Sequence, residues 1–348
     1  MSRRLGRGAA LGATAAALIV LVGCTADELP VPTSSPTPTF VSSYEAPPPF
    51  DLAPLTGAAV PVGSLTAPAF AAKIDNHPSA RPQVGLDRAD VVWEILVEGG
   101  LTRYIAVWQS DIPDTIGPIR SVRPVDPAVV SPQGGIFAFS GGQDRFVQAM
   151  RQAPVYSAIH GQRDTSDTMF RGQNAPSPHN VLVRAAQIVS EQSQLPAPPQ
   201  QFPFAESVSA ATATKEGAPT TRIDLRFGGS ATPAWVWSAD AERWLRYMTG
   251  GSPDTAQGGA QLSAVNVVVL RVDVQVIQSI PTVGLIGSGE AWVSTGGATV
   301  QATWSKSSLT DQIRILDANG VAVRLAPGTT WVELVPVNGA VSFSTPAT

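Results

Sequence analysis

Cysteine is almost absent from this sequence, since Cys24 is the single one among 348 residues. One cysteine excludes two classes of protein, the intrachain disulfide scaffold and the cysteine-rich zinc module. Charge is also sparse: charged residues make up 14% of the chain and the formal net charge is -4. Because nucleic-acid binders carry a basic surface, this balance predicts no nucleic-acid partner.

Signatures of metal binding and catalysis are missing as well. The histidines form neither an HxH nor an HExxH pattern and stand far apart in the chain, at His77, His160 and His179. We therefore expect no metal site. The chain has no GxSxG nucleophile elbow and no glycine-rich phosphate loop, so we expect no hydrolase triad and no cofactor.

What the chain does have is apolar content, with 43% hydrophobic residues. At 348 residues this composition predicts a globular protein with one or two cores.

The amino terminus carries a secretion signal. Arg3, Arg4 and Arg7 precede an uncharged run over residues 8–23, which is shorter than the ~20 residues of a membrane-spanning helix but suits a signal peptide. The end of this run, Leu21-Val22-Gly23-Cys24, resembles a bacterial lipobox, in which the cysteine is lipidated, for example with palmitate. We predict a signal peptide over 1–23 and a protein anchored through Cys24 to the cell membrane, on its extracytoplasmic face. The alternative is an ordinary signal peptide or a membrane anchor with a chance cysteine.

Proline dominates the next segment. Ten of the 31 prolines lie between residues 30 and 68, and no Lys or Arg occurs between Arg7 and Lys73. This composition predicts an extended tether over 24–66, without a basic patch that would hold it on anionic lipid.

Two folded regions follow, and we assign the chain to the α+β class. The first, over 67–200, is mixed α/β with a hairpin-rich sheet; strands are predicted at 70–74 and 136–139, and helices at 143–152 and 184–194. The second, over 201–343, is predicted to be mostly antiparallel β, with strands at 265–277, 291–294, 299–304, 312–316, 321–325 and 330–335. Gly-Gly and Asn-Gly pairs between several of these strands indicate a meander.

A hairpin is the most readable element of the first region. Two β-rich runs, residues 91–98 and 101–108, are separated by Gly99-Gly100, which indicates a two-residue turn. Alternation of side chains in that register puts three charged residues on one half-covered face: Glu94, Glu98 and Arg103.

Several blocks of the chain closely resemble the YerB-like bacterial lipoproteins. The blocks are residues 74–78, 80–86, 97–103 and 117–124, followed by Pro178-His179-Asn180, and weaker matches continue into the second region. The resemblance implies a lipid-anchored extracytoplasmic protein with two-part architecture and an unknown function. Where the family pattern implies a histidine before Asp254, this chain has Ser252-Pro253.

Arginines concentrate in the first region beside amides and histidines. Their forked guanidinium groups suit carboxylates, phosphates and peptide termini, although an internal ion-pair network is the alternative. The candidate binding or catalytic residues are Asp75, Asn76, His77, Arg81, Glu94, Glu98, Arg103, Arg120, Arg123, His179 and Asn180. For His77 we favour a role as a hydrogen-bond donor that fixes its loop.

The leading hypothesis from these residues is an envelope protein that binds a cell-wall component, such as peptidoglycan, or a protein partner. The alternative is a peptidoglycan-acting enzyme with Glu94, Glu98 or the Asp75 and His77 pair as acid or base. Because Glu94 and Glu98 lie roughly 13 Å apart along a strand, we favour structural pairing with Arg103 over catalysis.

Overall fold

The computed structural model describes residues 48–173 and 175–345. The predicted signal peptide and Cys24 lie outside this part of the chain. Strands account for 41% of the structure and helices for 14%, so a fold rich in β structure is confirmed. Four short α-helices occur among the described residues: α1 (Asp126–Val130), α2 (Asp144–Gln152), α3 (Ala185–Glu191) and α4 (Thr212–Glu216).

A central sheet of twelve strands contains strands from both predicted regions. Its main path, from edge to edge, is β11 (Ala218–Pro219), β19 (Ala298–Lys306), β18 (Gly287–Thr295), β16 (Asn266–Ile277), β21 (Thr330–Pro336), β4 (Val91–Leu96), β5 (Thr102–Trp108), β3 (Phe70–Asp75), β7 (Ile136–Phe139) and β8 (Tyr156–Ile159). Two more strands branch from it, β17 (Ile280–Gly284) beside β16 and β20 (Arg314–Leu316) beside β19. The boundary predicted at residue 200 stays a prediction.

Three smaller sheets surround the central one. A five-stranded sheet has the order β15 (Ser263–Ala264), β14 (Arg243–Tyr247), β13 (Ala234–Ser238), β12 (Arg222–Arg226) and β22 (Ala340–Ser344). A three-stranded sheet has the order β6 (Thr115–Ile116), β10 (Val181–Arg184) and β9 (Met169–Arg171). A two-stranded sheet pairs β1 (Phe50–Leu52) with β2 (Ala59–Pro61).

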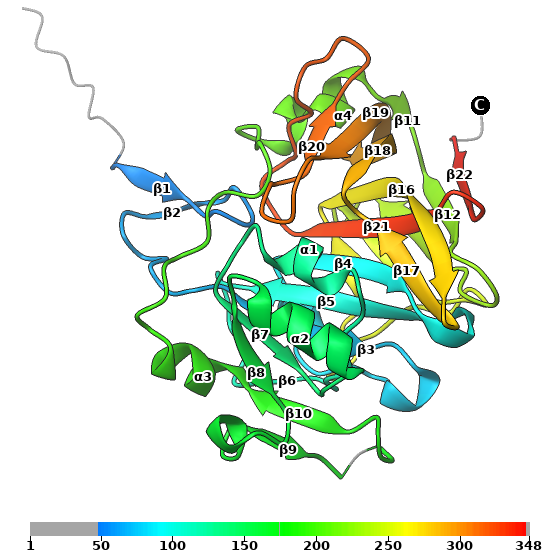
Figure 1. Ribbon diagram of the computed structural model, residues 1–348. Coiled ribbons are helices and arrows are strands. Elements are labelled where there is room, and N and C mark those ends of the chain that lie inside the picture. Colours follow the sequence, from blue (N-terminus) through cyan, green and yellow to red (C-terminus); the bar gives the residue numbers. More distant parts are fainter. Residues whose placement is uncertain (1–47, 174, 346–348) are drawn as a thin grey trace, which may run out of the picture. The chain divides into compact units, whose positions relative to one another are not determined.

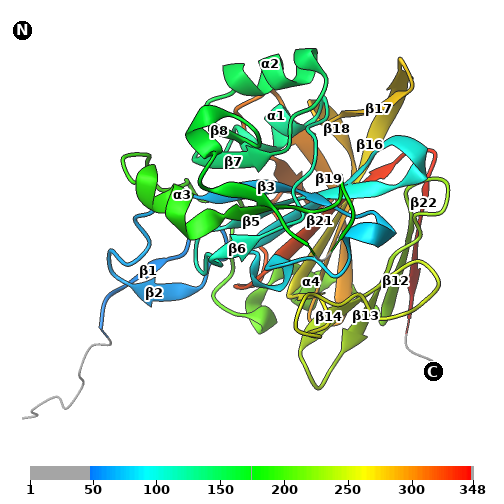
Figure 2. The same ribbon diagram turned by 90° about the horizontal axis from the view of Figure 1, so that it is seen from below.

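The central sheet is covered on both faces. One hydrophobic cluster joins Trp93 and Ile105 to Phe146 and Met150 of α2. The other joins Tyr104 and Trp108 to the five-stranded sheet, including Trp235. Figure 2 shows this arrangement, with α1 and α2 on one side of the central strands and β12–β14 on the other.

The predicted antiparallel meander is wrong at one strand. β21 pairs in parallel with both β16 and β4, because the connection from β16 to β21 runs through β17–β20 and is long enough to cross over. The predicted strand over 321–325 is also absent, and Val321 is 61% exposed. The hairpin of β18 and β19 around Gly296-Gly297 is confirmed.

The β4–β5 hairpin differs from its predicted register by one residue. Glu94 pairs with Tyr104 and Ile95 pairs with Arg103, because the connection has three residues, Glu98–Gly100, rather than two. A one-residue slip moves every side chain of one strand to the other face. Glu94 and Arg103 therefore lie on opposite faces of the sheet, and the predicted shared face is wrong.

The segment predicted as a tether is folded where the structure describes it. Residues 48–66 contain β1 and β2, and Leu55 is buried in the first hydrophobic cluster. The folded part of the protein therefore includes residues 48–66, which the sequence assigned to the tether. The extent of the tether before residue 48 stays a prediction.

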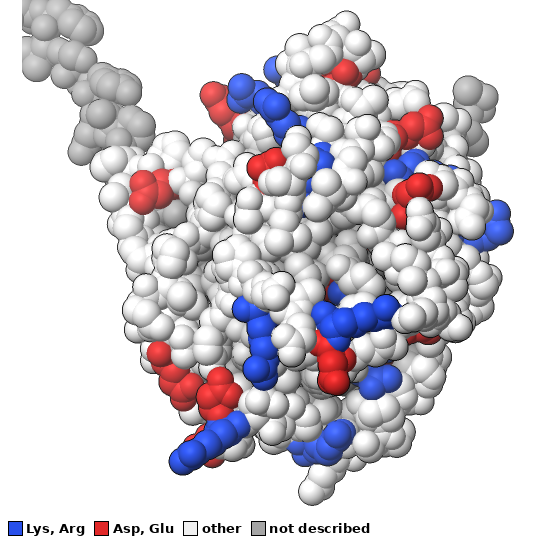
Figure 3. Space-filling model, in the orientation of Figure 1, with Lys and Arg blue, Asp and Glu red and all other residues white. Residues whose placement is uncertain are grey.

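None of the helices in the described ranges is both long and apolar enough to cross a bilayer. On the face shown in Figure 3, basic and acidic side chains are interspersed on a mostly uncharged surface.

Candidate functional site

Two hollows lie side by side where β3 ends. Leu101 and Thr102 line both of them, and consecutive residues of the loop after β3 point to different sides: Asn76 to one hollow and His77 to the other. We call the hollow of about 300 Å³ the arginine pocket; its charged and histidine lining is Asp75, His77, Glu98, Arg103, Arg120, Arg123 and His179. We call the hollow of about 460 Å³ the glutamate pocket; its polar lining includes Asn76, Arg81, Glu94, Arg246 and Thr249.

The arginine pocket is assembled from four segments of the first region. Arg103 lies on β5 directly opposite Asp75 at the end of β3. The loop that carries Arg120 is held against β3, where the Arg120 N–H donates to the Lys73 carbonyl at 2.7 Å. His179 arrives from the segment before β10. Seven of the eleven predicted site residues therefore meet in one pocket, although they span more than a hundred positions of sequence.

Asp75 organises the inner end of this pocket. Its Oδ2 lies 2.7 Å from Nδ1 of His179 and 3.0 Å from Nε of Arg120. The Arg120 contact is an ion pair without hydrogen-bond geometry, which leaves Nε of Arg120 without a hydrogen-bond acceptor. Because a carboxylate beside Nδ1 favours the proton on that nitrogen, the Nε2 atom of His179 is left as the free ring nitrogen.

The two histidines of the pocket stack on each other. Their ring centroids are 4.2 Å apart with an interplanar angle of 17°. His77 caps a 3₁₀ turn over Pro78–Ala80, and its Nδ1 accepts a hydrogen bond from the Ser79 N–H at 3.1 Å. His77 does fix its loop, but as an acceptor, so the predicted donor role is wrong. The carboxylate partner belongs to His179 rather than to His77.

The arginines of the pocket are crowded and keep free donors. Burial, followed by the like charges of Arg123 and Arg120, lowers the pKa of Arg103 to about 10. Arg103 donates one hydrogen bond to a protein atom of the described chain, the Ser121 carbonyl at 2.9 Å. A guanidinium group has five N–H donors, so most of those on Arg103 remain available to a ligand.

Glu98 closes the outer rim of the pocket. Its Oε2 accepts from Nε of Arg123 at 2.8 Å. Burial alone would raise the pKa of Glu98, but the hydrogen bond and charge of Arg123 outweigh it, and the net shift is downward. Three arginines therefore face two carboxylates, Asp75 and Glu98, and the pocket has an excess of positive charge.

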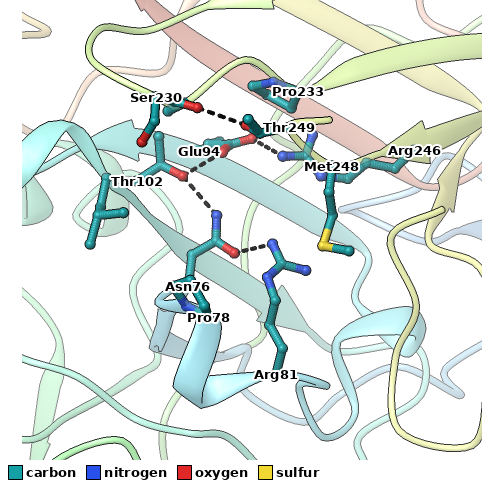
Figure 4. A pocket seen from close by; sticks show the side chains of 12 residues that line it. Asn76, Pro78, Arg81, Glu94, Thr102, Ser230, Pro233, Arg246, Met248 and Thr249 are labelled. Atoms are coloured by element: carbon teal, nitrogen blue, oxygen red, sulfur yellow. Dashed lines mark hydrogen bonds and ion pairs between the residues drawn. The ribbon is translucent and has the colours of Figure 1, made fainter. Parts of the chain in front are cut away.

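The glutamate pocket has a charged but internally satisfied floor (Figure 4). Glu94 accepts from the Thr102 hydroxyl at 2.6 Å with one oxygen and from Arg246 with the other. Arg81 donates to Asn76 and to Asp254. These groups are brought together from β4, β14 and the loops after β3 and β14.

Arg246 of β14 is the centre of this cluster and is 1% exposed. It lies 3.1 Å from Asp254, 3.1 Å from Glu333 and in contact with Glu94. Its guanidinium carbon also lies 4.7 Å from the ring centroid of Trp331. Burial alone would lower the pKa of Arg246, but the surrounding carboxylates raise it well above its usual value.

Glu333 is the third carboxyl group of the cluster. It lies beside Glu94 on the neighbouring parallel strand β21, and it accepts from the Trp235 indole N–H at 2.8 Å. Burial, and then the nearby charge of Glu94, raise the pKa of Glu333 well above its ordinary value. Burial therefore favours the protonated form of Glu333, which stands as a third carboxyl group beside Glu94, Asp254 and the two guanidinium groups.

The structure separates several residues that the sequence grouped. Glu94 and Glu98 line different pockets, so the predicted carboxylate pair does not exist. Arg103 is a partner of neither glutamate. Asn180 lines neither pocket, and its side-chain oxygen accepts from Arg171 at 2.8 Å.

Sequence reasoning missed the residues that hold the glutamate pocket together. Arg246, Glu333 and Tyr104 carry no local motif, and their partners are up to 152 positions away. Asp254 alone had a signal, because it stands in a loop that the family resemblance singled out. In the described ranges, no three His, Cys, Asp or Glu side chains are grouped as the ligands of a metal ion would be.

Comparisons with known proteins cover most of the folded chain. Residues 55–197 match the family model described as "Protein of unknown function (DUF3048) N-terminal domain", and residues 223–332 match the corresponding carboxy-terminal domain. Among curated proteins, the chain is 25% identical over 300 residues to "Putative lipoprotein YerB" of Bacillus subtilis (strain 168), covering 84% of this chain and 88% of that protein.

A solved structure shares the fold. The crystal structure of the YerB protein from Bacillus subtilis superposes with a TM-score of 0.71 at 22% sequence identity. The match covers 83% of this chain and 99% of that chain. The arrangement of sheets is therefore common to both proteins.

Proposed function

The chain belongs to the DUF3048 family, and from this membership we propose that it is a lipid-anchored protein of the bacterial cell envelope that binds an anionic cell-wall component. The similarity to a protein named as a lipoprotein supports the anchoring. In this proposal Cys24, which lies outside the described residues, carries the lipid, and the folded part works on the extracytoplasmic face of the membrane.

One observation carries the binding half of the proposal: three arginines line a single pocket and outnumber its carboxylates. Guanidinium groups pair with carboxylates and phosphates through charge-assisted, often bidentate hydrogen bonds. Arg103 is mostly buried, so its positive charge loses hydration, and the charges of Arg123 and Arg120 repel it. An incoming anion would relieve that repulsion. Peptidoglycan supplies such anions as the free carboxylates of its peptides and, where a peptide has been removed, of its lactyl groups.

The test is co-sedimentation of the full-length protein, in detergent micelles, with purified peptidoglycan. The variant Arg103→Gln/Arg120→Gln removes two charges from the pocket. Its control, Arg88→Gln, removes a charge of an exposed pair with Asp111 outside both pockets. We expect the pocket variant to lose at least about tenfold in affinity, which corresponds to about 1.4 kcal/mol. The control should sediment like the wild type. Equal sedimentation of all three proteins would contradict the proposal.

A second candidate function, hydrolysis of a peptidoglycan bond, is favoured by the pairing of Asp75 with His179 at 2.7 Å. A base oriented by a carboxylate beside anion-binding groups is a common catalytic arrangement. Incubation with peptidoglycan followed by mass spectrometry of the soluble products tests this candidate. Released fragments that disappear with His179→Gln would support catalysis, and the absence of fragments would leave binding as the function.

A further inference from the structure

We infer that the glutamate pocket is a second binding site, which takes the neutral ring of an N-acetylated sugar while the arginine pocket takes an anionic group attached to that sugar. The part of this inference that concerns the anion rests on the proposed function. The part that concerns the sugar stands on the geometry of the glutamate pocket alone.

The two pockets are close enough to serve one small ligand. Leu101 and Thr102 form a common wall, and the neighbours Asn76 and His77 reach into opposite sides of it. A ligand that occupies both pockets must therefore reach over this shared wall at the tip of the hairpin, because Glu94 and Arg103 lie on opposite faces of the sheet.

The floor of the glutamate pocket is polar without carrying a net charge. Arg81 and Arg246 are paired with Glu94 and Asp254, and burial raises the pKa of the third carboxyl group, Glu333, which favours its neutral form. Both oxygens of Glu94 are already hydrogen-bonded to protein groups. A ligand that brings its own charge would disturb this balance, whereas a neutral one with hydroxyl and amide groups would not.

The walls of the same pocket combine apolar and hydrogen-bonding groups. Pro233 and Met248 offer an apolar surface, and Thr249 and Ser230 form a polar rim (Figure 4). A sugar ring has apolar C–H faces and polar edges, and an acetamido group adds a methyl and an amide. The cavity of about 460 Å³ falls within the usual range of small-molecule sites, about 300–1,000 Å³.

N-acetylmuramic acid combines the two chemistries in one molecule, since it is an N-acetylated sugar with a carboxylate on a short lactyl ether. Its two halves are available separately as N-acetylglucosamine, which is neutral, and lactate, which is anionic. These three compounds can therefore probe the two pockets one at a time and together.

The experiment is calorimetric titration of the full-length protein in detergent micelles with each of the three compounds. Ser230→Trp places a bulky side chain at the exposed rim of the glutamate pocket, and Ser308→Trp is the matched control at an exposed serine outside both pockets. We expect N-acetylmuramic acid to bind at least about tenfold more tightly than lactate. Ser230→Trp should abolish this advantage and leave lactate binding unchanged, while Ser308→Trp should change neither.

The outcomes separate the two proposals. If N-acetylmuramic acid and lactate bind equally, the sugar site is refuted and the arginine pocket remains an anion site. If N-acetylglucosamine binds and lactate does not, and Ser230→Trp blocks that binding, the sugar site is supported and the proposed anion site fails. If none of the three compounds binds, the sugar site is refuted, and co-sedimentation with peptidoglycan decides the proposed function independently.

Discussion

At the scale of single residues, the charge of Arg246 is held in the core by groups from three other parts of the chain. Asp254, Glu94 and Glu333 supply the acceptors, and Trp331 packs against the guanidinium group. A buried charge that loses its partners costs several kcal/mol, so this cluster is sensitive to any change in its balance. The nearby charge of Glu94 contributes to the raised pKa of Glu333, so removal of that charge would favour ionisation of Glu333.

This coupling predicts that substitutions of the two glutamates are not additive. Glu333→Gln replaces a carboxyl group whose neutral form burial favours by a neutral isostere and should change the free energy of unfolding by less than about 1 kcal/mol. Glu94→Gln should have a moderate effect, because Glu333 can take over the charge. The double variant leaves two guanidinium groups with Asp254 alone and should lose about 3–5 kcal/mol. Urea denaturation of the wild type and the three variants measures these changes. A double-variant loss equal to the sum of the single losses would contradict the explanation that Glu333 ionises when Glu94 loses its charge.

Lys73 predicts a dependence of stability on pH. It is fully buried in an ion pair with Asp126 at 2.8 Å, and burial lowers its pKa from 10.5 to about 8. Between pH 8 and 10.5 the unfolded chain binds the proton that the folded chain has lost, so the free energy of unfolding rises with pH in this window, by at most about 3 kcal/mol. Below pH 8 the folded and the unfolded chain both bind this proton, so Lys73 adds no dependence of stability on pH there. Urea denaturation at pH 7.5 and 9.5 should show the rise in the wild type but not in Lys73→Met/Asp126→Asn; identical pH dependence in both proteins would contradict it.

The arginine pocket was predictable residue by residue because its members stand in local motifs of polar residues and glycine or proline. Arg120 and Arg123 occur within one short loop, and His179 is followed directly by Asn180. Arg246 and Glu333 lie instead in strands of ordinary appearance. Their role follows from the charged groups that the fold places beside them. Most of these groups are distant in the sequence, so no local motif indicates them.

At the scale of elements, the β4–β5 hairpin shows why the presence of strands is easier to predict than their register. The two runs and the glycine pair were recognised, but the turn contains Glu98 as well as Gly99 and Gly100. Both glycines have positive φ, of 72° and 70°, as the predicted two-residue turn also requires. The glycines are therefore compatible with both turns. The one-residue error in register placed Glu94 and Arg103 on the same face, whereas they lie on opposite faces.

Gly100 also brings the hairpin against the wall of the glutamate pocket. A Cβ atom there would lie 3.1 Å from Cα of Gly229, next to Ser230 on the pocket rim, whereas a Cβ atom on Gly99 would meet no atom within 4 Å. Gly99→Ala should thus cost only the backbone strain of positive φ, about 1 kcal/mol. Gly100→Ala should cost about 2–3 kcal/mol, because the loop at Gly229 must move as well. Thermal or urea denaturation of the two variants compares them directly, and equal losses would show that the close approach has no energetic weight.

At the scale of the whole molecule, one sheet joins the two regions that composition suggested. β21 from the second region lies between β16 and β4, and it places Glu333 beside Glu94. The glutamate pocket depends on this pairing, since the first region supplies Glu94 and Arg81 to its floor, while the second supplies Arg246 and the rim. Local turn signals favoured an antiparallel meander and could not reveal a parallel strand inserted between distant partners.

We propose above all that an anionic cell-wall group binds in the arginine pocket. Nuclear magnetic resonance of the arginine Nε–Hε groups tests it most directly, with resonances assigned through single variants and peptidoglycan fragments bearing free carboxylates as the ligand. We predict that saturating ligand shifts the resonances of Arg103, Arg120 and Arg123 and leaves that of the exposed Arg88 unchanged. Unchanged resonances of the three pocket arginines, in a sample where the protein binds the fragments, would contradict the claim.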